Sequence, residues 1–250
     1  MLDYDGTLAP FRVERNEAVP YEGIRPLLDR IMAETPTRVA VISGRACADL
    51  VPLLGLRRTP EIFGGHGWEH RLPDGTTEAF PLGDGARAAI DAAAQWIAAH
   101  GLQARSERKA ASVTLHWRGM EEKDARHLAK SADDAWGPLA EAPGVELHAF
   151  DGGVELRALG RNKGDSVRTV LSTLPEGTPV AFLGDDLTDE DAFEALQDKG
   201  LRVLVRGEFR ETAADVWLTP PSELIGFLTQ WLESTGAGRS VRANLAIQEP

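Results

Sequence analysis

Two aspartates stand close together near the amino end of the chain, in residues 3–8, which read DYDGTL. Side chains two apart on an extended strand point to the same side, and Gly6 lets the chain turn directly afterwards. Such a pair can share the steps of a phosphoryl transfer. Asp3 attacks phosphorus, while Asp5 donates a proton to the leaving group and later accepts one from water. The same residues could instead form an Asx turn before a helix.

A second acidic group follows the apolar residues 180–183, which read VAFL. Beyond Gly184 come three carboxylates within five residues, those of Asp185, Asp186 and Asp189. Carboxylate oxygens clustered at a strand end suit Mg²⁺, and without a cation these side chains would repel one another. The alternative is a loop whose acidic residues favour the start of the next helix. The two interpretations are compatible.

Three further residues could serve a phosphate group. Lys163, which precedes Gly164 at an expected helix start, can neutralise charge on the transferred phosphoryl group, with Arg45 as a second cation that contacts the substrate. Ser43 ends an apolar strand, where its hydroxyl and the neighbouring amides can bind phosphate oxygens. Two of them have a plainer alternative. Lys163 could be a solvated surface lysine, and Ser43 could be the N-cap of the helix that begins near Ala46.

The order and spacing of these groups resemble the haloacid dehalogenase superfamily. Residues 3–7 match its first motif, Ser43 its second, Lys163 its third and residues 184–189 its fourth. The resemblance extends over nearly the whole chain, up to about residue 233. It implies a phosphatase that works through an aspartyl-phosphate intermediate.

The same resemblance implies magnesium as the cofactor. Its ligands would be the carboxylates of Asp3 and Asp185 and the backbone carbonyl of Asp5. Asp186 and Asp189 would not bind the metal but would support the residues that do.

Three segments outside these motifs resemble the trehalose-6-phosphate phosphatases of that superfamily: residues 65–69, 107–118 and 154–164. In that family the equivalent side chains line a polar pocket for a disaccharide. Here this implies the substrate ligands His66, Glu69, Glu107, Lys109, His116, Arg118 and Glu155. Glutamates can accept hydrogen bonds from sugar hydroxyls and the lysine can donate them. On the residues alone, the same side chains could belong to turns and to the polar face of half-buried strands.

Apolar strands and amphipathic helices alternate along the chain, which predicts an α/β fold with a largely parallel, Rossmann-like sheet. A mixed α+β block interrupts this rhythm. The simplest organisation is a catalytic core over residues 1–82 and 160–235, an inserted cap over residues 83–159, and a disordered tail over residues 236–250. The resemblance implies that such a cap selects the substrate and excludes water when it closes.

The first strand is expected to be short. Only Met1 and Leu2 precede Asp3, whereas a buried central strand normally brings a longer apolar run. We therefore expect the strand to lack its start and to give Asp3 a thin anchor, although no catalytic residue is lost.

The composition restricts the partners. With a formal net charge of −12, the chain lacks the basic surface that nucleic acids require, and no apolar run reaches the roughly 18 residues of a membrane span. No signal peptide is visible. Cys47 is the one cysteine, so no internal disulfide can form, which suits a reducing cytoplasm; its neighbours indicate a small helix residue rather than a nucleophile. We expect a cytoplasmic monomer that binds a small sugar phosphate.

Together these features predict a Mg²⁺-dependent phosphatase that hydrolyses trehalose 6-phosphate to trehalose and phosphate. One alternative is a related phosphatase for sucrose 6-phosphate or for mannosyl or glucosyl phosphoglycerate. Another is a non-catalytic, regulatory module that binds a sugar phosphate. The complete set of Asp3, Asp5, Ser43, Lys163 and Asp185 argues against that module, which would not need them all.

Overall fold

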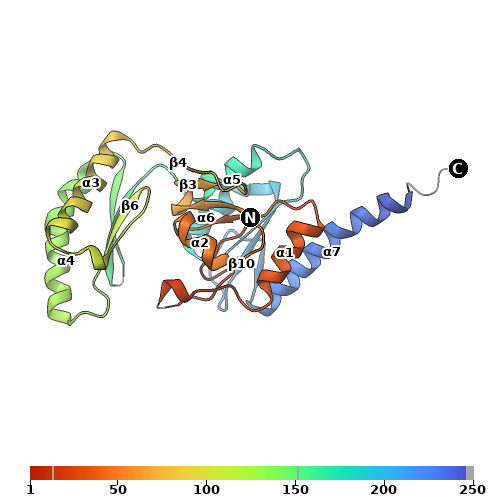
Figure 1. Cartoon of the computed structure of the whole chain (residues 1–250), viewed down its shortest axis with the longest axis horizontal. Helices are drawn as coiled ribbons and strands as arrows, with labels where there is room; N and C mark the ends of the chain where they lie inside the picture. The colour runs from red at the N-terminus through yellow and green to blue at the C-terminus, as the bar shows by residue number, and fades with distance from the viewer. Residues whose placement is uncertain (13, 151, 246–250) are drawn as a thin grey trace. The chain divides into compact units, whose positions relative to one another are not determined.

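The chain folds into two compact units (Figure 1). The computed structural model describes residues 1–12, 14–150 and 152–245, without the side chains of residues 15 and 237–245. The core unit comprises Met1–Glu78 and the chain from Asn162 onward, and the inserted unit comprises Ala79–Arg161. The sequence places the two boundaries at residues 82/83 and 159/160, four and two residues away from those of the structure. No helix in the described part of the chain has both the length and the apolarity that a membrane crossing requires.

The core unit is built on a predominantly parallel sheet. One part has the order β1-β2-β3-β4 and the other the order β11-β10-β9. β1 and β2 are parallel, as are β9, β10 and β11, whereas β3 is antiparallel to β2. The bounds of these strands are Ala40–Ile42 (β1), Glu61–Gly64 (β2), Glu69–Arg71 (β3), Thr77–Ala79 (β4), Ala181–Gly184 (β9), Leu201–Val205 (β10) and Val216–Leu218 (β11).

The first residues of the chain join the two parts of the sheet. Leu2 forms parallel bridges to Val41 on β1 and to Leu183 on β9. Its N–H donates to Ala40 at 2.9 Å, and the N–H of Asp3 donates to Leu183 at 2.8 Å. Asp3 is therefore held on a central strand by backbone bonds to both neighbours, although only two residues precede it.

Helices cover both faces of this sheet, which confirms the predicted α/β fold class. Helices α1 (Ile24–Glu34), α2 (Cys47–Leu54) and α7 (Ser222–Leu245) pack on one face, and α5 (Lys163–Leu171) and α6 (Glu190–Leu196) on the other. β1 shows the reason, because Val41 belongs to the first apolar cluster whereas Ala40 and Ile42 belong to the second. A strand buried on both faces is apolar throughout, as the sequence of this segment indicates.

Helix α2 carries the chain away from Ser43 and is held at both ends. At its start, the Glu69 side chain accepts the N–H of Cys47 at 2.7 Å. At its end, the guanidinium of Arg25 on α1 donates to the carbonyls of Leu53 and Leu54, both at 2.9 Å. The acidic side chain at the start of the helix and the basic one at its end suit the helix dipole, and they satisfy backbone groups that would otherwise lack partners.

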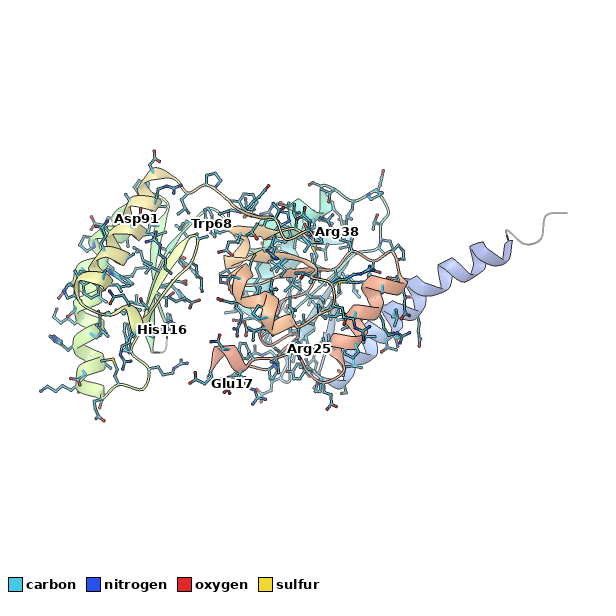
Figure 2. The ribbon with its side chains drawn as sticks, in the orientation of Figure 1. Glu17, Arg25, Arg38, Trp68, Asp91 and His116 are labelled. Atoms are coloured by element: carbon cyan, nitrogen blue, oxygen red, sulfur yellow. The ribbon has the colours of Figure 1, made fainter. Side chains whose placement is uncertain are left out.

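The inserted unit is an antiparallel sheet with two helices. Its strand order is β5-β6-β8-β7, with the bounds Ser106–Arg108 (β5), Ser112–His116 (β6), Val145–Phe150 (β7) and Gly153–Ala158 (β8). Helices α3 (Asp84–Ala99) and α4 (Glu122–Trp136) bury apolar residues together with Val113, Leu115 and Leu156. Alternation along β6 and β8 sends the polar side chains of these strands to the opposite face. Figure 2 shows His116 on β6 and Asp91 on α3.

A disordered tail over residues 236–250 stays a prediction, although the structure continues helix α7 into the first part of that range. Helix α7 continues to Leu245, and residues 246–250 lie outside the described residues. Gly236 and Gly238 each cost about 1 kcal/mol in a helix interior. A helix already nucleated by the residues before them can extend across that cost, because propagation is easier than nucleation.

Candidate active site

Four charged side chains meet at the carboxyl ends of the central strands. The Lys163 ammonium lies 2.7 Å from Asp3 Oδ1 and 2.7 Å from Asp189 Oδ1. Asp3, Asp185 and Asp189 each place a carboxylate oxygen within 4.8 Å of the others. All four residues are buried. The structure therefore brings Asp3, Lys163, Asp185 and Asp189 together, as their positions in the sequence predict.

Lys163 is fixed by the helix that it begins. Asn162 is the N-cap of α5, and its side chain accepts the N–H of Asp165 at 3.2 Å. The Asp165 carboxylate accepts the N–H of Asn162 in return, at 2.9 Å. This capping box fixes the start of α5, so the lysine leaves the helix at a defined point. The sequence places the helix start here without indicating the capping pair.

Asp189 organises the loop that follows β9. Its Oδ2 accepts the backbone N–H groups of Asp185 at 2.9 Å and Asp186 at 3.0 Å, while its Oδ1 accepts from Lys163. Asp186 in turn accepts the N–H of Leu187 at 2.8 Å. Asp189 thus supports Asp185 and Lys163 at once, which fits the supporting part that the resemblance implies for it.

Two arginines that the sequence does not single out also hold this loop. Arg210 donates to the carbonyl of Asp186 at 2.7 Å and to that of Asp185 at 3.3 Å. Arg206 donates to the carbonyl of Asp185, also at 3.3 Å. Both follow β10 at positions with no motif of their own, so nothing in the sequence distinguishes them from surface arginines.

Gly6 is required by the close approach of Asp185. Gly6 has φ +84°, and a Cβ atom built there would lie 2.1 Å from Asp185 Oδ2. The next residue, Thr7, is fully buried and donates to Asp185 Oδ1 at 3.4 Å. The glycine thus lets the loop after Asp3 touch the loop after β9, and Thr7 is a site residue that the sequence analysis does not single out.

The cluster holds more negative charge than Lys163 can balance. Burial raises the pKa of Asp3 to about 6, with Lys163 opposing the rise and Asp189 adding to it. Burial and then the charge of Asp3 raise the pKa of Asp185 to about 9. Burial alone would lower the pKa of Lys163, but the negative charges of Asp3 and Asp189 outweigh this effect and raise it. Carboxylates that resist ionisation beside one another are a suitable donor set for a hard divalent cation.

Magnesium is expected to stabilise the protein more near pH 8 than near pH 5. A carboxyl whose pKa is raised on folding keeps its proton in the folded chain after the unfolded chain has released it, so the metal-free protein loses stability as pH rises from about 4 toward about 9. A bound cation replaces those protons. We expect Mg²⁺ to raise the thermal midpoint by at least about 4 °C near pH 8 and by much less near pH 5.

Differential scanning fluorimetry with Mg²⁺ and with chelator measures this effect. The Asp185→Asn variant is the control, because it removes the carboxylate with the most strongly raised pKa and should lose most of the Mg²⁺ shift. An equal shift at both pH values, or an undiminished shift in the variant, would contradict a metal site at these residues.

Asp5 lies beside Asp3 in sequence but has a different partner. Its two carboxylate oxygens accept from Nε and Nη2 of Arg45, both at 2.6 Å. Arg45 is 3% exposed and lies over the ring of Tyr4. Burial opposes the arginine's charge, but the hydrogen bonds and charge of Asp5 outweigh it and raise the pKa of Arg45. Contact between Arg45 and the substrate stays a prediction; in this structure the guanidinium holds Asp5.

Ser43 and the turn that contains His66 lie against each other. The Ser43 hydroxyl accepts the N–H of Arg45 at 3.2 Å, and the Ser43 carbonyl accepts the N–H of His66 at 2.9 Å. Helix α2 begins at Cys47, and its N-cap, Ala46, has no side-chain cap bond. Ser43 therefore shapes the loop ahead of the helix and does not cap the helix itself. The imidazole of His66 packs so closely on Gly44 that a Cβ there would lie 2.5 Å from Nε2.

The predicted substrate ligands of the inserted unit gather on the sheet face opposite its helices. Lys109 Nζ lies 3.8 Å from Glu107 Oε1 and 3.9 Å from Glu155 Oε1. Glu155 also accepts from the hydroxyl of Ser112 at 2.7 Å. Residues Glu107, Lys109 and Glu155 thus form one polar cluster, whose fourth member, Ser112, the sequence analysis does not assign to the site.

His116 and Arg118 lie at the end of β6. The His116 ring meets that of Phe150 edge to face, with centroids 5.7 Å apart. The backbone N–H of Arg118 donates to the carbonyl of Gly152 at 3.2 Å, and its side chain lies against that glycine. These contacts fix both residues next to the β7–β8 hairpin. Their contact with a substrate stays a prediction, as does that of His66 and Glu69 in the core unit.

Comparison with known proteins agrees with this geometry. A family model described as trehalose-phosphatase matches residues 1–214. The trehalose-phosphate phosphatase of Mycobacterium marinum is 33% identical over 257 aligned positions, which cover 94% of this chain and 62% of that protein. The chain thus spans about three fifths of the length of that curated relative. The predicted resemblance is confirmed.

Solved structures confirm the fold. The trehalose-6-phosphate phosphatase of Aspergillus fumigatus superposes with a TM-score of 0.62 at 26% identity, covering 93% of this chain and 92% of that one. A haloacid dehalogenase-like hydrolase from B. subtilis superposes with a TM-score of 0.57 at 17% identity, covering 91% and 98%. The second match bears on the fold alone and agrees with the predicted haloacid dehalogenase-like architecture.

Proposed function

We propose that this chain, which belongs to the trehalose-phosphatase family, hydrolyses trehalose 6-phosphate to trehalose and inorganic phosphate. The observation that carries the proposal is the buried contact of Lys163 with both Asp3 and Asp189, at 2.7 Å each. It supports Asp3 as a nucleophile, because the ammonium favours the ionised carboxylate in a site whose burial disfavours it. The complete site favours an enzyme over a non-catalytic binding module.

The first half of the reaction forms an aspartyl-phosphate. A carboxylate oxygen of Asp3 attacks phosphorus, and the bond between phosphorus and the sugar oxygen breaks. The proton that the sugar oxygen needs comes from Asp5. Lys163 holds the Asp3 carboxylate in place and offsets charge on the phosphoryl oxygens.

The second half releases phosphate. Asp5, now ionised, accepts a proton from water as the water oxygen attacks phosphorus, and the bond between phosphorus and Asp3 breaks. Arg45 fixes Asp5 through two hydrogen bonds at 2.6 Å in the structure.

Magnesium fits the cluster of raised-pKa carboxylates. Asp3 and Asp185 would hold it with their side chains and Asp5 with its backbone carbonyl, while Asp189 keeps the Asp185 loop in place. When bound, the ion supplies positive charge for the phosphoryl oxygens.

The substrate is proposed from the family together with the polar cluster of Glu107, Lys109 and Glu155. A carboxylate and an ammonium about 4 Å apart can accept from and donate to neighbouring hydroxyls of a sugar. The cluster supports a sugar-binding task for the inserted unit, while the phosphate chemistry resides in the core unit.

A Glu155→Ala variant is expected to separate these two tasks. We expect kcat/KM for trehalose 6-phosphate to fall by about 10²-fold, because a half-buried, charged hydrogen-bond partner of a sugar hydroxyl is lost, which is on the order of 2–3 kcal/mol. The rate on p-nitrophenyl phosphate, which has no sugar, should change by less than about threefold. Steady-state kinetics on both substrates measure the difference.

The matched control is Glu122→Ala on α4, where the glutamate is exposed and pairs only with Arg126 among the contacts of the described residues. It should leave both rates unchanged. Equal losses on both substrates in Glu155→Ala would count against a sugar pocket at this cluster, and no preference of the unaltered chain for trehalose 6-phosphate would reject the proposed substrate.

A further inference from the structure

The peptide group between Asp185 and Asp186 is hydrogen-bonded at both of its ends. Its N–H, which belongs to Asp186, donates to Asp189 Oδ2 at 3.0 Å. Its carbonyl, which belongs to Asp185, accepts from Arg206 and Arg210, both at 3.3 Å. The N–H of Asp185 donates to the same Asp189 oxygen at 2.9 Å. A carboxylate thus holds the N–H side of this loop and two guanidinium groups hold the carbonyl side, so both peptide planes next to the Asp185 side chain are fixed.

Arg210 uses all three of its guanidinium nitrogens here. Nε donates to the carbonyl of Asp185, and Nη2 donates to that of Asp186 at 2.7 Å. Nη1 donates to Glu190 Oε1 and to the carbonyl of Glu211, the latter at 2.8 Å. A planar guanidinium that is bonded on each side cannot rotate without losing several hydrogen bonds. Arg210 therefore acts as a rigid link between Glu190 and the Asp185–Asp186 peptide.

Glu190, the first residue of α6, fixes the other side of this link. Its Oε1 also accepts from the hydroxyl of Thr212 at 2.7 Å, and its Oε2 accepts the N–H of Ala213 at 2.8 Å. Burial alone would raise the pKa of Glu190, but its three hydrogen-bond donors outweigh this effect and lower it. Glu190 and its sequence neighbour Asp189 are thus two carboxylates that hold the same loop from its two sides.

Arg206 reaches the carbonyl of Asp185 from the end of β10. Its own backbone is fixed to β11, because its N–H donates to the carbonyl of Leu218 at 2.9 Å. Its carbonyl accepts the indole N–H of Trp217 at 2.7 Å. The Trp217 ring meets that of Phe209 edge to face, with centroids 5.5 Å apart. These contacts hold the segment that carries both arginines against β11.

The two arginines contact the backbone of Asp185, whereas its carboxylate has other neighbours. The carboxylate lies against Gly6, where a Cβ would be 2.1 Å from Oδ2, and accepts from Thr7 at 3.4 Å. Because the carboxylate is packed in this way, the position of its oxygens depends on that of the backbone. Mg²⁺ requires ligand oxygens at about 2.0–2.1 Å in near-ideal octahedral geometry, so a small shift of this backbone weakens its binding.

We propose that Glu190, Arg206 and Arg210 are positioning residues that set the affinity of the site for Mg²⁺. They fix the Asp185–Asp186 peptide, and with it the direction in which the Asp185 carboxylate leaves the backbone. They act through the backbone and are not ligands of the ion. The inference rests on the proposed magnesium site and adds the residues that hold Asp185 in place. Removal of residues that orient a metal ligand typically lowers metal affinity about 10–100-fold.

Isothermal titration calorimetry of Mg²⁺ into the full chain, without substrate, tests the proposal. In Arg210→Met we expect the Kd for Mg²⁺ to rise at least about tenfold. Arg210→Lys should be affected nearly as much, because lysine keeps the charge but lacks the planar fork that bonds in several directions. Arg206→Met should raise the Kd by about threefold, since Arg210 still holds the same carbonyl.

Amide hydrogen exchange of the metal-free protein reports on the loop itself. We expect the N–H of Asp186 to exchange at least about tenfold faster in Arg210→Met, because the carbonyl end of its peptide is held less firmly. Phosphate release by this variant should be low at limiting Mg²⁺ and should recover as Mg²⁺ is raised. A loss that came only from lower stability of the fold would not be recovered selectively by the ion.

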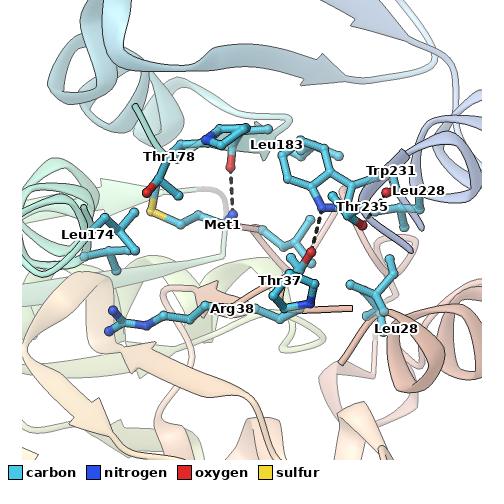
Figure 3. Close-up of a pocket in the computed structure, with 18 of the residues that line it drawn as sticks. Met1, Leu28, Thr37, Arg38, Leu174, Thr178, Leu183, Leu228, Trp231 and Thr235 are labelled. Carbon is cyan, nitrogen blue, oxygen red and sulfur yellow. Dashed lines mark hydrogen bonds between the residues drawn. The ribbon is translucent and has the colours of Figure 1, made fainter. Parts of the chain in front are cut away.

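Arg38→Met is the matched control, because it breaks a comparable pair at the other end of the sheet. Arg38 donates to both oxygens of Glu61, at 2.7 and 2.8 Å. It lines a cavity at the amino ends of β1 and β9 (Figure 3), whereas Asp185 follows the carboxyl end of β9. This variant should lose stability but keep its Kd for Mg²⁺. Thermal unfolding of each variant establishes that it is folded under the titration conditions.

An unchanged Kd in Arg210→Met would overturn the proposal, and so would a rise that Arg38→Met shows equally. Full affinity in Arg210→Lys would also overturn it, because charge alone would then explain the effect. If Arg210→Met does not fold, Arg206→Met decides, since it leaves the bonds of Glu190 intact, and an unchanged Kd there contradicts the proposal. A failure of the proposed magnesium site is distinguishable, because the unaltered chain would then bind no Mg²⁺ in the same titration.

Discussion

An Asp3→Asn variant is expected to lose at least about 10⁴-fold in phosphatase turnover while keeping its fold. The amide has the shape of the carboxylate and can still accept a hydrogen bond from Lys163, but it lacks the negative oxygen that attacks phosphorus. The fold should survive, because the backbone bonds of Asp3 to β9 are unaffected. Removing one of several crowded carboxylates also relieves repulsion within the cluster.

Phosphate release and thermal unfolding, measured on the same preparation, check this expectation. Asp74→Asn is the matched control, because Asp74 lies in the turn between β3 and β4 and accepts the N–H of Thr76 at 2.8 Å, which asparagine can also accept. It should keep full activity. Near-normal turnover by Asp3→Asn would remove Asp3 as the nucleophile, whereas unfolding of that variant would show that the carboxylate is needed for the fold.

Replacement of Lys163 by methionine should damage both activity and stability. Lys163 is 3% exposed, and its ammonium contacts two buried carboxylates. Without it, Asp3 and Asp189 remain as buried charges with no cation between them, a change that costs about 3–5 kcal/mol of unfolding free energy in comparable pairs. Turnover should fall by at least about 10³-fold, because the same ammonium offsets charge on the phosphoryl group.

The pH dependence of this variant distinguishes lost charge from lost packing. Removing Lys163 takes away the interaction that opposes the rise in the pKa of Asp3, now about 6, so that pKa should rise further. Protonation then removes the repulsion at low pH, and the stability gap to the unaltered chain should narrow from about pH 8 to about pH 5. Denaturant unfolding at both pH values measures this gap.

Lys130→Met on α4 is the control for Lys163→Met. Lys130 is 76% exposed and pairs with Asp134 one turn away. Exposed pairs of this kind contribute less than about 1 kcal/mol, so this variant should remain close to the unaltered chain. If the stability difference between Lys163→Met and the unaltered chain is equally large at both pH values, lost packing and not lost charge explains the lower stability of the variant.

The meeting of Asp3, Lys163 and Asp185 could be predicted because it follows from topology. Asp3 and Asp185 each follow an apolar strand, and the carboxyl ends of parallel strands meet at one edge of a sheet. The structure places these two strand segments side by side, with Leu2 bridged to Leu183. Lys163 begins the helix on one face of the same sheet, so its position was also determined by the order of elements.

The partner of a long side chain could not be predicted in the same way. The sequence allows Arg45 to contact either a substrate phosphate or Asp5, and the structure shows its two bonds to Asp5. Glu69 has a task that its position does not indicate, because it accepts the N–H of Cys47 at the start of α2. Arg210 contacts the Asp185–Asp186 loop from more than twenty residues away. Sequence spacing carries no information on such contacts.

The inserted unit shows an intermediate case. Alternation along β6 and β8 predicts one polar face, and the register that pairs Thr114 with Glu155 places Glu155 beside Ser112 and Lys109. The polar face was therefore predictable, whereas its internal contacts required the register. After residue 235 the periodicity is weak and predicts disorder, whereas the structure continues helix α7 to Leu245; the predicted disorder stays a prediction.

Phosphate release from trehalose 6-phosphate, run beside sucrose 6-phosphate and glucose 6-phosphate with Mg²⁺ and with chelator, tests the central claim most directly. We predict that kcat/KM for trehalose 6-phosphate exceeds that for the other sugar phosphates by at least about tenfold, which corresponds to about 1.4 kcal/mol of transition-state discrimination. Chelation should abolish the rate, and Mg²⁺ should restore it. Equal rates on all three sugar phosphates, or a rate that persists in chelator, would contradict a magnesium-dependent trehalose-6-phosphate phosphatase built around Asp3.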